Sequence, residues 1–202
     1  MFRFRTRRPL FIRAFAWRLA LRLRCPRRVA GGYQVFFFTT DEGLDELAAR
    51  LDRALTLLGH SDARRDRALR SYARQFIVWA AEYSLAFPRS GQIVLSASML
   101  ETGSVPWIAS MVVHEATHLR IYHRGIPYTR ALKGRIERRC VAEQAAFLRL
   151  CGREAEAAYV EDALKEQWWT DEHVKLSSDR FAKEAQLTRW HLWLGRAFRW
   201  LT

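Results

Sequence analysis

The pentapeptide His114-Glu115-Ala116-Thr117-His118 narrows the fold of this chain more than any other feature of its sequence. On an α-helix, residues four apart lie about 40° from each other around the axis, so both imidazoles project from one face. Two imidazoles on one face can hold a single metal ion. The carboxylate beside the first histidine then lies close enough to take a proton from a water bound to that ion. This chemistry requires a helix here, with a partner segment that completes the site.

The flanking sequence predicts this helix over residues 104–122. Ser104 is a suitable N-cap residue, Pro106 suits the first turn, and Gly125 is a suitable stop. Apolar residues recur at helical spacing, at Trp107, Ile108, Met111, Val112, Leu119 and Tyr122. The alternative is an ordinary core holding two histidines and a carboxylate, but a buried carboxylate with nothing to bind is costly. The sequence therefore favours a metal site on a buried helix.

A catalytic zinc site needs a third protein ligand and keeps one position open for water. The metzincin pattern requires Gly at position 121 and His at position 124, where this chain has Ile121 and Arg124. The gluzincin pattern takes a Glu from a second helix about twenty residues on. Eighteen residues separate His118 from Glu137, which agrees with the gluzincin spacing.

Residues 130–150 are expected to form this second helix, and it contains a rival ligand. Glu143 lies six residues after Glu137, about 240° round the helix, so only one of the two can face the metal. We favour Glu137 for its spacing and its place within an apolar stripe. The alternative for either carboxylate is an ion pair with neighbouring arginines.

The strings VVHEATHLR (112–120) and RIERRC (135–140) resemble a family of small, uncharacterised bacterial zincin-like proteins, and more distantly the gluzincin metallopeptidases. The likeness covers residues 93–150. It implies an α+β zincin-like domain: a short mixed or antiparallel sheet packed on the HExxH helix, with a mainly helical C-terminal half. It implies one Zn²⁺ per chain on His114, His118 and Glu137, with Glu115 as general base for peptide hydrolysis. GAMEN-type and NExxS-type substrate motifs are missing, which leaves the substrate class open.

Two further roles need residues that the motif does not supply. Stabilising an oxyanion needs a hydrogen-bond donor, for which the sequence offers Tyr122, His123, Tyr128, Tyr159 and His173. Cys140, one turn after Glu137, is a candidate for a place beside the metal, or is simply a small buried apolar residue. If Cys140 bound the metal it would close the site, and the zinc would then be structural.

The net charge of +13 is concentrated at the N-terminus, because residues 1–30 contain ten arginines and no acid. We interpret this segment as a basic arm or amphipathic helix preceding a single domain over residues 31–202. Its charges exclude a transmembrane span, while its aromatic and aliphatic residues leave contact with an anionic membrane surface open. Nucleic-acid binding is disfavoured, since no recognisable nucleic-acid module accompanies the arm. Three cysteines without a CxxC pair favour a cytoplasmic protein, with peripheral attachment to the inner membrane face as an alternative.

Residues 27–32 are expected to be a linker, and the remaining elements follow from local patterns. A capping box at Thr39 and Glu42 should open a helix that ends near Gly59. Strands are expected at 33–39, 75–79, 83–87 and 92–96, and further helices near 153–169 and 178–201. By the resemblance, Ile93 to Leu95 should form the edge strand that aligns a peptide substrate.

Two other classes of function remain open at the level of sequence. One is a non-catalytic zincin-fold protein for binding or sensing, with a structural zinc and an association with the membrane surface. The other is an adaptor that binds lipid or nucleic acid through residues 1–30 and carries a vestigial site. The presence of Glu115 favours an enzyme that acts on a peptide or protein, because a purely structural zinc site usually closes with a fourth protein ligand.

Overall fold

The structure is a computed structural model and describes residues 25–39, 43–80 and 83–166. The predicted N-terminal helix, His173 and the predicted helix near 178–201 lie outside these residues. None of the helices formed by the described residues combines the length and the apolar character needed to cross a membrane.

A five-stranded mixed sheet forms one layer of the fold. Its strands are β1 (Arg27–Ala30), β2 (Tyr33–Phe38), β3 (Gln75–Trp79), β4 (Leu85–Phe87) and β5 (Gln92–Ser96). They lie in the order β1-β2-β3-β5-β4. The three central strands are parallel to one another, and the two outer strands are antiparallel to their neighbours.

Six α-helices accompany the sheet in the described part of the chain, so the predicted α+β class with a mixed sheet is confirmed. In chain order they are α2 (Leu44–Ser61), α3 (Ala63–Tyr72), α4 (Ala97–Thr102), α5 (Val105–His123), α6 (Lys133–Leu150) and α7 (Glu154–Ala163). A short 3₁₀ turn, Leu164–Glu166, follows α7.

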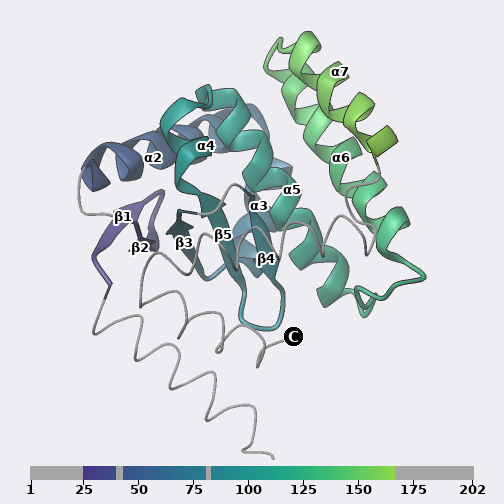
Figure 1. The fold of residues 1–202 in the computed structure, drawn as a ribbon, viewed down its shortest axis with the longest axis horizontal. Helices are drawn as coiled ribbons and strands as arrows, with labels where there is room; N and C mark the ends of the chain where they lie inside the picture. Colours follow the sequence, from purple (N-terminus) through teal and green to yellow (C-terminus); the bar gives the residue numbers. More distant parts are fainter. Residues whose placement is uncertain (1–24, 40–42, 81–82, 167–202) are drawn as a thin grey trace, which may run out of the picture.

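Alternation along the strands divides the apolar side chains between the two faces of the sheet. On one face Val35, Phe76 and Ile93 join the main core with Leu51 of α2 and Val112 of α5. On the opposite face a second cluster contains Phe36, Ile77, Trp79 and Val94. Helices α6 and α7 lie beyond α5, away from the sheet (Figure 1). The α5 helix is therefore enclosed between the sheet layer and α6.

The N-terminal part of the sheet differs from the sequence-based expectation. The expected linker over 27–32 is strand β1 followed by a tight turn. Gly31 and Gly32 both have positive φ, 55° and 84°, as a two-residue hairpin turn requires. Arginines are tolerated in β1 because it is an exposed edge strand.

The predicted capping box at Thr39 and Glu42 does not open α2, and Glu42 lies outside the described residues. The helix begins at Leu44, and its N-cap residue is Gly43, which makes no side-chain capping bond. Burial of Leu44 and Leu47 against the core sets this start. Helices α3 and α4 were not expected at all.

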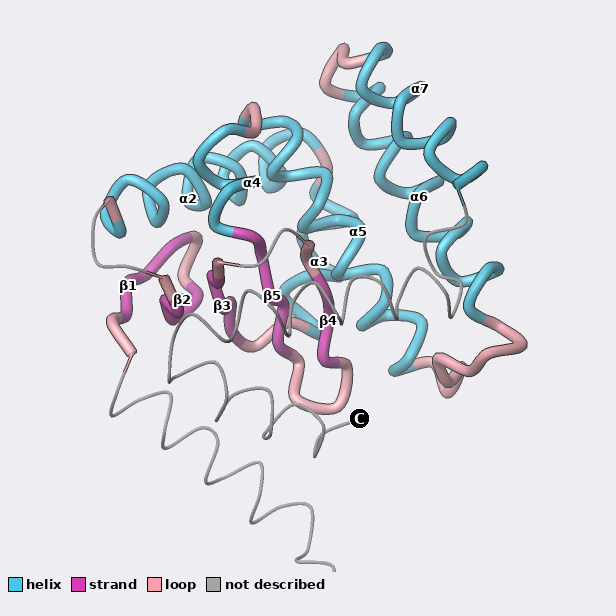
Figure 2. Tube along the Cα trace, in the orientation of Figure 1, coloured by secondary structure: helices cyan, strands magenta, loops and turns pink. Residues whose placement is uncertain are grey.

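The position of β5 also corrects an expectation. It pairs with β3 on one side and β4 on the other, and all five of its residues are buried. The edge strand on this side of the sheet is β4, which reaches β5 through a hairpin at residues 88–91 (Figure 2). The sequence pattern identified both strands, but pattern alone does not distinguish an inner strand from an outer one.

Candidate metal centre

Helix α5 starts as its sequence predicts. Ser104 Oγ accepts a hydrogen bond from the backbone N–H of Trp107 at 3.2 Å, and Pro106 lies in the first turn. The helix runs to His123, and Gly125 follows with a φ of 80°. The turn that carries His114 and Glu115 is buried because neighbouring elements cover α5 on more than one side.

A loop of nine residues, 124–132, reverses the chain so that α6 returns along α5 (Figure 2). This return places Glu137 opposite the two histidines. Glu137 Oε2 lies 3.4 Å from His114 Nε2, and Glu137 Oε1 lies 3.6 Å from His118 Nε2. The two Nε2 atoms are 3.3 Å apart. The structure therefore brings together the three residues that the sequence singled out as metal ligands.

Glu137 and His114 shift the pKa of each other. Burial would raise the pKa of Glu137, but its close contacts with both imidazoles and their charge outweigh this effect, so this pKa lies well below its usual range. Burial would lower the pKa of His114, but Glu137, Glu115 and Gln144 outweigh it, so this pKa is raised. Without a metal, the Glu137 carboxylate and the His114 imidazole thus each favour the charged form of the other.

Glu115 lies beside His114, and one of its carboxylate oxygens lacks a hydrogen-bond partner among the described residues. Its side chain is buried, and Oε2 makes no hydrogen bond with any described residue. Burial raises its pKa, partly opposed by the charges of His114 and His118. A buried carboxylate oxygen without a partner is unusual, and it commonly marks a site that receives a proton, water or ion.

Tyr128, in the α5–α6 loop, is the predicted hydrogen-bond donor that lies at the site. Its hydroxyl donates to Glu137 Oε1 at 2.6 Å, and its ring meets that of His118 edge-on, with centroids 5.6 Å apart. Burial and the charge of Glu137 raise its pKa. The residue as a whole remains 46% exposed, so its ring lies at the boundary between the site and solvent.

The structure places three other predicted donors in different contacts. His123 stacks on Tyr72 at 5.1 Å between centroids, and Tyr122 meets the ring of His123. Tyr159 of α7 is 66% exposed and packs beside Trp107.

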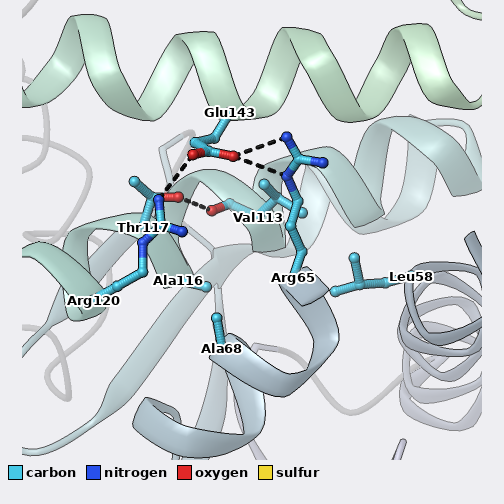
Figure 3. A pocket seen from close by; sticks show the side chains of 8 residues that line it. All are labelled: Leu58, Arg65, Ala68, Val113, Ala116, Thr117, Arg120 and Glu143. Atoms are coloured by element: carbon cyan, nitrogen blue, oxygen red, sulfur yellow. Dashed lines mark hydrogen bonds and ion pairs between the residues drawn. The ribbon is translucent and has the colours of Figure 1, made fainter. Parts of the chain in front are cut away.

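Glu143, the rival third ligand, lies in an ion-pair cluster. Its carboxylate pairs with four guanidinium groups, those of Arg64 and Arg65 on α3, Arg120 on α5 and Arg139 on α6. Figure 3 shows it between these helices, at the wall of a small pocket. Burial would raise the pKa of Glu143, but the arginines lower it to about 2. Glu143 therefore forms ion pairs with arginines, which is the alternative to metal binding that the sequence allowed.

Cys140 is fully buried and lies close to the histidines. Its Sγ and one ring nitrogen each of His114 and His118 all lie within 4.8 Å of one another, which makes these three residues a second possible ligand set. Burial and the neighbouring carboxylates raise the pKa of its thiol, so a thiolate is disfavoured until a metal binds it.

Sequence reasoning missed Gln144, which contacts His114 from α6. Its Oε1 lies 3.0 Å from His114 Nδ1, and its Nε2 lies 3.3 Å from Ser110 Oγ. Gln144 follows Glu137 by seven residues, or two helical turns, so both side chains lie on one face of α6. That spacing was the available signal.

No protein-family model matches the chain, and neither a curated protein nor a solved structure matches it. The geometry of the site therefore carries the functional conclusion.

Proposed function

We propose that this protein is a zinc-dependent metallohydrolase that cleaves peptide bonds, with Zn²⁺ held by His114, His118 and Glu137. The observation that carries the proposal is the convergence of two Nε2 atoms and one carboxylate on a single point beside Glu115. Two imidazoles and a carboxylate are a ligand set typical of catalytic zinc, with a fourth position left to water.

The distances within this group support a metal of zinc's size. Zinc binds imidazole nitrogen and carboxylate oxygen at about 2.0–2.2 Å, so the ligand atoms of a tetrahedral site lie roughly 3.3–3.5 Å apart. The observed separations of 3.3, 3.4 and 3.6 Å agree with this spacing. Little movement of α5 against α6 would be needed to accept the ion.

When bound, Zn²⁺ would acidify a coordinated water and polarise the scissile carbonyl. Glu115 is the base in this proposal: its free Oε2 accepts the proton of the attacking water and passes it to the leaving amine. Its raised pKa suits this role, since a base works best with a pKa near the operating pH. The Tyr128 hydroxyl, which donates to Glu137 Oε1 in the structure, would turn its single hydrogen toward the developing oxyanion at the exposed side of the site.

An extended peptide would be held along β4. Among the described strands β4 pairs only with β5, so the other edge of its backbone is not used by them. Strand β4 also contacts α5, the helix that carries the two histidines, so a peptide paired with β4 would lie near the site. Backbone pairing along an edge strand binds peptides with little dependence on side chains.

The second candidate function is a non-catalytic zincin-fold protein with a structural zinc, in which Cys140 serves as a ligand. The cluster of Cys140 with His114 and His118 favours this alternative. A site closed by a thiolate would leave no position for water. The two functions therefore predict different metal stoichiometry in different variants.

Metal content measured by mass spectrometry separates them. We expect about one zinc per chain in the wild type, in Glu115→Gln and in Cys140→Ser, and loss of zinc in Glu137→Ala. Arg138→Ala, an exposed neighbour on α6, is the matched control and should keep its zinc. Zinc retained in Glu137→Ala and lost in Cys140→Ser would establish the structural site instead. A peptide library cleaved by the wild type but not by Glu115→Gln would then test hydrolysis.

A further inference from the structure

We infer that Gln144 and Ser110 hold the His114 imidazole in the tautomer that presents an unprotonated Nε2 to the metal, which makes Gln144 a positioning residue. The consequence for metal binding rests on the proposed function. The tautomer itself is a property of the metal-free chain and can be measured separately.

The Ser110 hydroxyl donates its hydrogen to a backbone carbonyl. Its oxygen lies 2.7 Å from the backbone carbonyl oxygen of Trp107, one turn back on α5. A carbonyl oxygen only accepts, so the single hydroxyl hydrogen of Ser110 is used in this bond. Toward any other neighbour Ser110 Oγ can only accept.

The neighbours of the Gln144 amide fix which of its ends carries the NH₂ group. One end of this amide lies 3.3 Å from Ser110 Oγ and 3.1 Å from Met111 Sδ. Both neighbours are acceptors, so the NH₂ group must be at this end. The amide oxygen is therefore the atom that faces His114.

The Gln144 amide oxygen fixes which ring nitrogen of His114 carries the hydrogen. His114 Nδ1 lies 3.0 Å from Gln144 Oε1, which only accepts, so Nδ1 carries a hydrogen. A neutral imidazole has one N–H, and the lone pair is then on Nε2. Nε2 is the atom that lies 3.3 Å from His118 Nε2 and 3.4 Å from Glu137 Oε2.

Burial makes this chain of bonds effective. Ser110 is 0% exposed, Gln144 3% and His114 7%, so solvent has little access to replace a lost partner. A flipped amide would set a donor against the Nδ1 hydrogen and the amide oxygen against two acceptors. The amide also orients His114 without adding a third buried negative charge to those of Glu115 and Glu137.

The test is the tautomer of His114 in the full-length, metal-free protein. Long-range ¹H–¹⁵N spectra of histidine-labelled protein distinguish protonated from unprotonated ring nitrogens, at a pH above the pKa of His114. His114→Asn assigns the signals. We expect the hydrogen on Nδ1 in the wild type, and a shift toward the Nε2–H form in Gln144→Leu and, through a less fixed amide, in Ser110→Ala.

Glu in place of Gln144 retains an acceptor, so Gln144→Glu should keep the Nδ1–H form. Gln92→Leu removes a buried amide in β5 and is the matched control, which should leave the His114 tautomer unchanged. Zinc affinity, from competition with a chelator, should fall about 10- to 100-fold in Gln144→Leu and far less in Gln144→Glu.

An Nε2–H form in the wild type would overturn the inference, as would an unchanged Nδ1–H form in both Gln144→Leu and Ser110→Ala. If Gln144→Leu does not fold, Ser110→Ala and Gln144→Glu decide the outcome. A wild type that shows the Nδ1–H form but binds no zinc would contradict the proposed function and leave the tautomer assignment intact.

Discussion

Glu137 and Glu143 lie six residues apart on α6, yet their buried carboxylates have different kinds of partner. Glu137 meets the two histidines of α5, and Glu143 meets four arginines on three helices. Both carboxyl pKa values are lowered, the first by imidazoles and the second by guanidinium groups. The proposed metal binding and the helix packing therefore depend on separate carboxylates of one helix, and substitutions can separate the two effects.

Glu143→Gln should destabilise the fold without removing a metal ligand. It leaves the guanidinium groups of Arg65 and Arg120, 12% and 13% exposed, without their shared carboxylate. Breaking such a buried pair costs about 3 kcal/mol. Urea denaturation would measure this loss, with Glu101→Gln on the exposed surface as control. A loss below about 1 kcal/mol would show that the cluster does not stabilise the fold.

The arginines around Glu143 should contribute unequally to the free energy of unfolding. Arg120 is 13% exposed, and Arg139 is 60% exposed, although both donate to the same Glu143 oxygen. Solvent screens an exposed pair, so Arg139→Ala should change the free energy of unfolding by less than about 1 kcal/mol. Arg120→Ala should cost two or more times as much. Equal effects in the same denaturation experiment would contradict this ranking.

The stability of the protein should fall in acid, and Glu143 should account for part of the fall. Its folded pKa of about 2 is below the value of about 4.3 in an unfolded chain. The stabilisation is thus complete above pH 4.3 or so and is lost as the pH falls toward 2. The difference in unfolding free energy between wild type and Glu143→Gln should shrink by on the order of 3 kcal/mol across this window.

Glu137 also has a lowered pKa, so Glu143→Gln should retain some of this acid sensitivity. Chemical denaturation at a series of pH values gives both curves. A constant difference between them would mean that Glu143 is not ionised differently in the folded and unfolded states.

Glu115→Gln should keep zinc, lose hydrolysis and stabilise the metal-free protein. The substitution keeps the shape of the side chain and removes a buried charge whose Oε2 has no partner among the described residues. We expect a gain of about 1 kcal/mol in unfolding free energy and a fall of at least about 100-fold in kcat. A variant that still turns over at the wild-type rate would exclude Glu115 as the base.

Tyr128→Phe should lower kcat with little change in zinc content. The phenyl ring can keep the edge contact with His118, whereas the hydroxyl that donates to Glu137 is removed. Loss of one oxyanion donor lowers kcat by about 100- to 1,000-fold. Tyr159→Phe, on an exposed ring of α7, is the control and should be unaffected. If both variants behave alike in steady-state kinetics, Tyr128 has no role in the reaction.

The local sequence was sufficient for the elements whose own residues specify them. Ser104, Pro106 and the apolar spacing predicted helix α5, and the apolar runs predicted β2, β3 and β5. The spacing between His118 and Glu137 also indicated which carboxylate would face the histidines. The helix and strand predictions depend on periodicity within one segment, which backbone geometry sets. The spacing between His118 and Glu137 spans two helices and was indicated by its likeness to gluzincin sites.

The tertiary structure decided what depends on which segments become neighbours. Strand order made β4 the outer strand in place of β5, and β1 formed from a segment with no strand pattern because β2 offered it an edge. Arginines from α3 and α5 meet Glu143 of α6, and the packing of α6 on α5 places Gln144 against His114. Helical and strand periodicity determine which face of an element is apolar, but the partner of that face is chosen by packing across the whole core.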